Sequence, residues 1–150
     1  MKKVIFLTIF ALLTLASCSN SSHWSSVAEQ TMNLNEAVSY CSNLNESGHN
    51  DWRLPNIDEL RTLIQNHSGT VTGGTCPISE KTGKLASTDK TNDCNRRSGN
   101  NFSKLESVSG FFWSSSRQSD RPDTGWVVDF SGGGVVRSNT MIHGYVRCFR

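Results

Sequence analysis

The sequence has no apolar run long enough to span a membrane, and it carries little net charge. Its longest nearly apolar stretch is Val4–Leu15, whereas a membrane-spanning helix needs roughly 20 residues. The formal net charge is only +2, from 15 basic and 13 acidic residues. A chain so close to neutral has no general electrostatic attraction for nucleic acid, which we therefore exclude as a partner.

Closely spaced metal ligands are also missing. No two of the five cysteines stand at the two-residue spacing of a zinc or redox motif, and the four histidines are scattered along the chain. We therefore expect no metal ligands and no other cofactor.

The N-terminus has the pattern of an export signal. Lys2 and Lys3 precede the apolar stretch, and small residues then lead to Cys18, as in a secretory signal peptide. A cysteine directly after the small residues is typical of the bacterial lipoprotein signal. We therefore predict a signal peptide over residues 1–17, lipid attached to Cys18, and a tether over residues 18–33.

Lipid attachment determines the expected location. Acyl chains on Cys18 would anchor the protein to a membrane, which is then its first partner. The next residue is Ser19, whereas Gram-negative lipoproteins retained in the inner membrane carry aspartate there. We therefore expect a lipid-anchored protein of the cell envelope, in the outer membrane if the host has one.

Four cysteines remain for the folded domain, which we assign to residues 34–150. They are Cys41, Cys76, Cys94 and Cys148. An even number of cysteines in an exported domain predicts two disulfides, and four cysteines allow three pairings.

Two helices are predicted in the first half of this domain. The first covers Leu34–Glu46, where apolar residues recur at helical spacing. The second begins after Pro55, because Asn56 and Glu59 have the spacing of a capping box. Its apolar stripe consists of Ile57, Leu60, Leu63 and Ile64.

The second half of the domain combines a long loop with strands. Segment 68–101 is polar and lacks periodicity, and we expect it to be ordered by a disulfide of its own. Short β-type segments follow at 111–114, 126–130, 135–137 and 145–149. Two helices followed by antiparallel strands and a long loop predict an α+β fold.

Several blocks of this sequence resemble the Lcl C-terminal domain family, a family of bacterial domains. The blocks are Tyr40-Cys41, Asn50-Asp51-Trp52-Arg53-Leu54-Pro55-Asn56, Glu59-Leu60, Phe112-Trp113-Ser114-Ser115-Ser116, Trp126-Val127-Val128-Asp129-Phe130 and Val146-Arg147-Cys148. The resemblance implies a C-type-lectin-like fold, in which two helices flank small antiparallel sheets and a long disulfide-stapled loop. It also implies that Cys41 pairs with Cys148, which leaves Cys76 to pair with Cys94.

The resemblance further implies binding rather than catalysis. The adhesin after which the family is named binds sulfated polysaccharides through this domain, so we expect a domain that binds a surface glycan or a protein. The alternative is a structural lipoprotein that docks other envelope proteins. The Glu/Gln-Pro-Asn/Asp triplet of calcium-dependent lectins is absent, because Pro55, Pro77 and Pro122 stand in other contexts.

An enzyme is the second alternative. Trp52-Arg53-Leu54-Pro55 followed by Glu59 also resembles formylglycine-generating and other sulfatase-modifying enzymes. Those enzymes use a closely spaced pair of cysteines near the C-terminus, whereas Cys148 stands alone in its predicted strand. We therefore expect no catalytic residues.

The candidate ligand-binding residues lie at the end of the long loop. Arg96, Arg97 and Asn101 stand close together in the sequence. Guanidinium groups suit sulfate or carboxylate through forked hydrogen bonds, and amides suit hydroxyl groups. These residues therefore predict an acidic glycan as ligand, with an envelope or host-surface protein as the other possible partner class.

Overall fold

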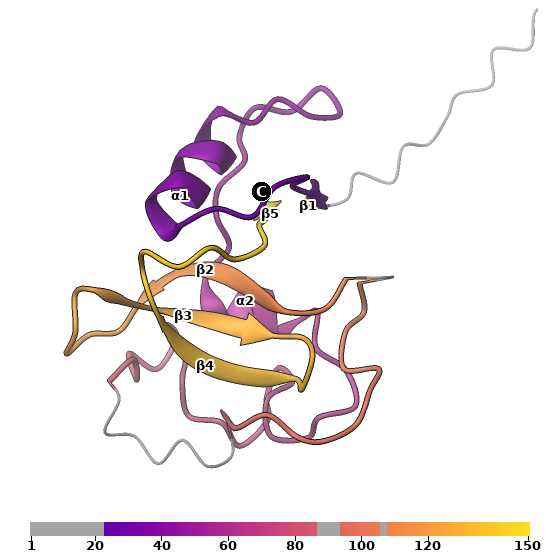
Figure 1. Ribbon diagram of the computed structural model, residues 1–150, viewed down its shortest axis with the longest axis vertical. Coiled ribbons are helices and arrows are strands. Elements are labelled where there is room, and N and C mark those ends of the chain that lie inside the picture. The colour runs from indigo at the N-terminus through magenta and orange to yellow at the C-terminus, as the bar shows by residue number, and fades with distance from the viewer. Residues whose placement is uncertain (1–22, 87–93, 106–107) are drawn as a thin grey trace, which may run out of the picture.

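The computed structural model describes residues 23–86, 94–105 and 108–150 (Figure 1). The predicted signal peptide and lipid site Cys18 lie outside the described residues. No helix within the described ranges is both long and apolar enough to cross a bilayer. The elements are β1 (Trp24–Val27), α1 (Leu34–Asn43), α2 (Ile57–Arg61), β2 (Phe111–Arg117), β3 (Thr124–Asp129), β4 (Gly134–Asn139) and β5 (Arg147–Phe149).

The strands form two small antiparallel sheets. One has the order β2-β3-β4, and the other pairs β1 with β5 from opposite ends of the domain. Figure 1 shows α1, β1 and β5 on one side of the three-stranded sheet and the loop segments between α2 and β2 on the other. The predicted α+β class is confirmed, whereas the C-type-lectin-like architecture stays a prediction.

The three-stranded sheet separates two apolar cores. Adjacent residues of a strand point to opposite faces, so Phe112 enters one core and Trp113 the other. The first core also contains the predicted helix stripe, and the second contains Cys41 and Cys148. Each core therefore holds one helix to one face of the sheet.

Both helices are shorter than predicted. The first ends at Asn43 instead of Glu46, because Leu44 is already extended and Glu46 pairs with His49 in a tight turn. The second has the predicted capping box of Asn56 and Glu59, but its last turn tightens after Arg61. The predicted stripe is nevertheless buried in full.

The folded part begins before the predicted tether ends. Trp24–Val27 form β1, and Ser25 and Ala28 are buried, so the expectation of a tether reaching residue 33 is wrong for this stretch. Trp24 pairs with Phe149, and their rings lie 4.8 Å apart in an edge-on contact. This pairing joins residues that are far apart in the sequence, so the composition around Trp24 could not predict it.

Both disulfide pairings are confirmed. Cys41 bonds to Cys148 and thereby links α1 to β5. Cys76 bonds to Cys94 and closes the long loop. The described parts of segment 68–101 contain no α-helix and no strand longer than an isolated bridge, in agreement with the loop prediction.

Candidate functional site

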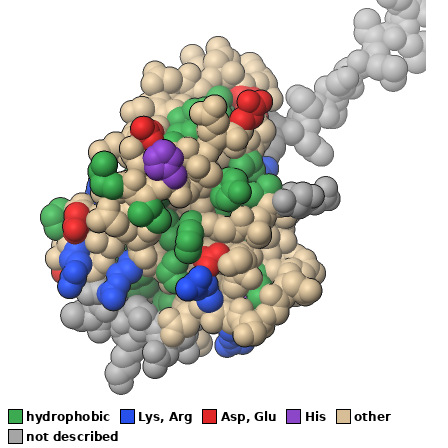
Figure 2. All heavy atoms as spheres, in the orientation of Figure 1, with side chains coloured by type: hydrophobic (Ala, Val, Ile, Leu, Met, Phe, Trp, Pro, Cys, Tyr) green, Lys and Arg blue, Asp and Glu red, His purple; other side chains and the backbone are tan. Residues whose placement is uncertain are grey.

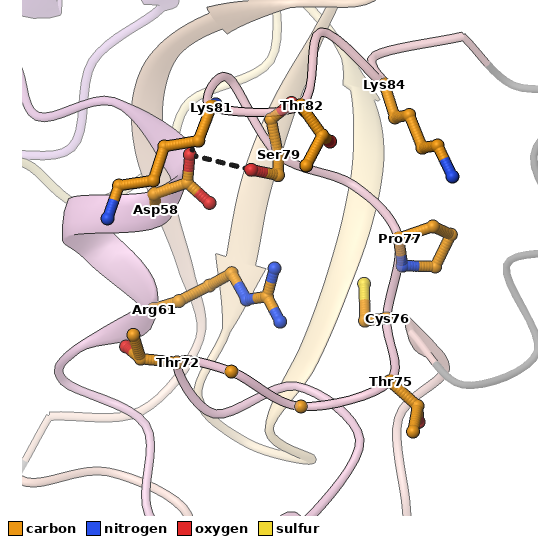
Figure 3. A pocket seen from close by; sticks show the side chains of 12 residues that line it. Asp58, Arg61, Thr72, Thr75, Cys76, Pro77, Ser79, Lys81, Thr82 and Lys84 are labelled. Atoms are coloured by element: carbon orange, nitrogen blue, oxygen red, sulfur yellow. Dashed lines mark hydrogen bonds between the residues drawn. The ribbon is translucent and has the colours of Figure 1, made fainter.

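A cavity of ≈ 530 Å³ opens between α2 and the loop that follows it. Figure 3 shows side chains from both segments pointing into this space. The lining residues are Asp58, Arg61, Thr72, Gly73, Gly74, Thr75, Cys76, Pro77, Ser79, Lys81, Thr82 and Lys84. The loop residues all belong to the segment 68–101.

Two side chains of α2 hold the loop in place. Asp58 and Arg61 are three residues apart, which places them on the same side of the helix. The Asp58 carboxylate accepts hydrogen bonds from the Ser79 hydroxyl (3.0 Å) and the Lys81 backbone N–H (3.2 Å). Asp58 therefore fixes the rim of the cavity that carries the lysines.

Arg61 is the structural centre of the cavity. The residue is only 4% exposed, and its guanidinium donates to the carbonyls of Thr70 (2.7 Å), Ile78 (2.8 Å) and Val71 (3.0 Å). A guanidinium has five N–H groups, so two remain after these bonds. Figure 3 shows the group directed into the space between helix and loop.

The charge of Arg61 is only partly balanced. Burial lowers the pKa of its guanidinium, and the Asp58 carboxylate acts in the opposite direction. No carboxylate among the described residues forms a salt bridge with it. A buried cation bonded to neutral carbonyls favours an anion that reaches its two remaining N–H groups.

Backbone geometry also shapes the cavity wall. A side chain at Gly74 would collide with the carbonyl oxygens of Ser68 and Gly69. The Cys76 N–H also donates to the Gly69 carbonyl (2.8 Å), and this hydrogen bond holds two segments of the loop close together. Gly74 is therefore required by this close approach of backbone to backbone.

The predicted residues Arg96, Arg97 and Asn101 do not line this cavity. The Arg97 N–H donates to the Gly132 carbonyl in the turn between β3 and β4 (2.9 Å). The Asn101 side-chain oxygen accepts from the Gln65 amide (2.7 Å). The structure therefore brings the two arginines to the β3–β4 turn and Asn101 to the segment after α2.

Arg96 has a structural contact that the sequence did not suggest. Its Nη1 lies 3.1 Å from Oδ2 of Asp129, whose side chain is only 2% exposed. Its aliphatic stem packs so closely on the turn that a side chain at Gly132 or Gly134 would collide with it. Of the two arginines, Arg97 is thus the one more available to a ligand.

The cavity residues Asp58, Arg61, Lys81 and Lys84 were missed by the sequence analysis. One signal could have pointed to Arg61: it stands four residues after Ile57 and three before Ile64, on the apolar side of the helix, where a cation is unusual without a dedicated set of acceptors. The groups that accept hydrogen bonds from Arg61 are backbone carbonyls, and the pattern of side chains in the sequence does not predict them.

Comparison with known proteins places the chain in a family of domains. The family model of the Lcl C-terminal domain matches residues 14–150, which include both helices, both disulfides and every strand. No curated protein and no solved structure matches the chain. The chain therefore belongs to the Lcl C-terminal domain family, a family of envelope-associated proteins.

Proposed function

We propose that this protein is an envelope lipoprotein whose domain binds an acidic glycan, without catalysis, in the cavity beside α2. The observation that carries the proposal is the charge of the cavity lining. The lining includes three residues with cationic side chains, Arg61, Lys81 and Lys84, and one with a carboxylate, Asp58. This is a local excess of positive charge on a domain that is nearly neutral.

The other lining groups suit a sugar. The hydroxyls of Thr72, Thr75 and Thr82 can donate to and accept from sugar hydroxyls. The volume of ≈ 530 Å³ falls within the range of small-molecule sites. Lys81 and Lys84 are exposed, so their flexible ammonium groups can follow sulfate or carboxylate groups along a chain.

The cysteine chemistry supports binding over catalysis. Cys148 is bonded to Cys41, and Cys76 to Cys94, so the four cysteines of the described residues are engaged in disulfides. The enzymatic alternative would use a reactive cysteine pair near the C-terminus. A thiol nucleophile has to be present as thiolate, which a disulfide-bonded sulfur is not.

Docking of another protein has less support. The exposed large apolar side chains of the described residues are Val38, Met141 and Ile142. On the face drawn in Figure 2, apolar side chains form small groups separated by polar atoms. Protein-binding patches are typically contiguous over several hundred Å².

Removal of two lysines should weaken binding. We expect Lys81→Ala/Lys84→Ala to lower the affinity for heparin about tenfold, which corresponds to ~1.4 kcal/mol. The salt dependence of binding should also flatten, because fewer exposed charges remain to be screened. Calorimetry with heparin, and with uncharged dextran as a negative probe, measures both effects.

Two other variants make this test specific. Arg121→Ala/Arg137→Ala removes the same charge from exposed positions outside the cavity and should leave the affinity unchanged. Arg97→Ala tests the patch predicted from the sequence without disturbing the Arg96–Asp129 pair. A loss of affinity for Arg97→Ala alone would move the site to that patch, and parent-like affinity in every variant would reject both sites.

The lipid anchor is a separate part of the proposal. We propose that Cys18 carries the lipid and that the protein resides in the cell envelope, in the outer membrane of a Gram-negative host. Cys18→Ser should shift the protein from the membrane fraction to the soluble fraction. Metabolic labelling with a fatty acid should mark the parent and leave the variant unmarked; an unmarked parent would contradict the anchor.

A further inference from the structure

The guanidinium of Arg61 is fixed in place, so a ligand has to come to it. Its hydrogen bonds reach the carbonyls of Thr70 and Val71 in one part of the loop and that of Ile78 in another. Thr70 and Ile78 are fully buried. If the guanidinium swung outward, these carbonyls would lose their donor inside the protein, which is unfavourable. The remaining N–H groups of Arg61 therefore stay at one depth in the cavity.

Those remaining N–H groups are accessible only to a narrow group. Nε, Nη1 and Nη2 each make one of the three hydrogen bonds, so Nη1 and Nη2 each keep one N–H. Figure 3 shows the guanidinium between α2 and the loop, with Thr75, Cys76 and Pro77 on the side away from the helix. Water reaches only 4% of the surface of Arg61. A sugar ring is much wider than a water molecule, so it cannot lie directly on this guanidinium.

The charge of the site favours a group with a single negative charge. The guanidinium carries one positive charge, and none of the salt bridges among the described residues involves it. A sulfate ester or a carboxylate would balance this charge. A phosphate monoester carries close to two negative charges at neutral pH, and the second charge would lose its hydration without a buried partner.

Reach then separates a sulfate ester from a carboxylate. In a uronic acid the carboxylate is attached directly to the sugar ring. A sulfate on a secondary hydroxyl stands one oxygen further out, and a sulfate on the primary hydroxyl also has a rotatable carbon between the ring and that oxygen. The last group extends furthest from the ring. Its terminal oxygens can accept from both N–H groups of Arg61 and from a hydroxyl of Thr72 or Thr75 in the cavity wall.

We propose that Arg61 selects glycans that carry sulfate on a primary hydroxyl: the sulfate enters the cavity end-on, and the sugar ring stays at the rim beside the exposed Lys81 and Lys84. The inference rests on the proposed binding of an acidic glycan in this cavity. It assigns different roles to the cations. The exposed lysines attract any polyanion and are screened by salt, whereas the buried guanidinium recognises the position of one sulfate.

Two modified heparins with the same number of sulfates test this selection. One lacks the sulfates on primary hydroxyls, and the other lacks those on secondary hydroxyls. We expect the full-length protein in detergent to bind the first about tenfold more weakly than the second, because the charged hydrogen bonds to Arg61 are missing. Calorimetry measures both affinities. Equal affinities, or a preference for the first heparin, would overturn the inference.

Arg61→Lys shows whether the guanidinium makes the selection. An ammonium has three N–H groups, and the three carbonyls use all of them, so the charge stays but no N–H remains for sulfate. Folded Arg61→Lys should bind the two heparins equally, whereas Lys81→Ala/Lys84→Ala should weaken both and keep their ratio. A preference that persists in folded Arg61→Lys would overturn the inference. If this variant does not fold, the two affinities of the parent decide.

Unmodified heparin separates this inference from the proposed function. A parent protein that does not bind unmodified heparin has no site for acidic glycans, and both proposals then fail. A parent protein that binds unmodified heparin, and binds the two modified forms equally, retains the proposed function. In that case only the selection by Arg61 is rejected.

Discussion

Replacement of Cys41 and Cys148 by alanine together should lower the free energy of unfolding by about 4–5 kcal/mol. The disulfide joins residues 107 positions apart, and in the chain-entropy model a loop of that length gives a stabilisation of this size. The bond also holds β5 against α1. Because β5 belongs to a two-stranded sheet, which is marginal by itself, we expect the β1–β5 pairing to be lost with it.

Urea unfolding of the oxidised proteins measures this effect. The matched control is Cys76→Ala/Cys94→Ala, whose disulfide closes a separation of 18 residues and should contribute about 3 kcal/mol. Tryptophan fluorescence should also change more in the first variant, since Trp24 lies in β1. A larger loss of stability in the control than in the first variant would contradict the assignment of the stabilising role to the Cys41–Cys148 bond.

Arg61→Met should also lower the stability of the domain substantially. Methionine fills much of the same volume but leaves the carbonyls of Thr70, Val71 and Ile78 without their donor. Buried acceptors without partners cost about 1–3 kcal/mol each, and water that enters from the cavity replaces part of the loss. We therefore expect a destabilisation of about 3 kcal/mol.

The loop itself should report the change. Gly74 and Cys76 donate backbone hydrogen bonds inside the segment that Arg61 holds, so their amide protons should exchange faster with solvent in the variant. Arg137→Met, at an exposed position of β4, is the control and should stay within about 0.5 kcal/mol of the parent. Parent-like stability and exchange in Arg61→Met would show that the loop holds its shape without the guanidinium.

The Arg61 prediction and the Cys76/Cys94 control concern one feature of the domain: its long loop is stabilised by specific bonds rather than by regular structure. The Cys76–Cys94 disulfide, the Asp58 carboxylate and the Arg61 guanidinium each connect the long loop to itself or to α2. A binding surface made by such a loop is well ordered before the ligand arrives. Less conformational entropy is then lost on binding.

Local signals in the sequence were sufficient for much of the regular structure. The capping box of Asn56 and Glu59 depends on residues within one helical turn. The apolar stripe of this helix likewise depends only on the spacing of residues a few positions apart. β-type composition predicted segments at 111–114 and 126–130, and the structure has strands at Phe111–Arg117 and Thr124–Asp129. The number of cysteines limited the disulfides to three pairings, and the family resemblance then selected the correct one.

The tertiary structure alone decided β1 and the cavity. The Arg147 side chain donates to the Ser25 carbonyl across 122 residues of chain, and no local pattern marks Trp24–Val27 as the partner of β5. Likewise, the acceptors of Arg61 are backbone carbonyls, and the partner of Arg96 is an aspartate 33 positions away. Periodicity and capping depend on neighbours within a few residues, whereas these contacts depend on the path of the whole chain, so only the folded molecule reveals them.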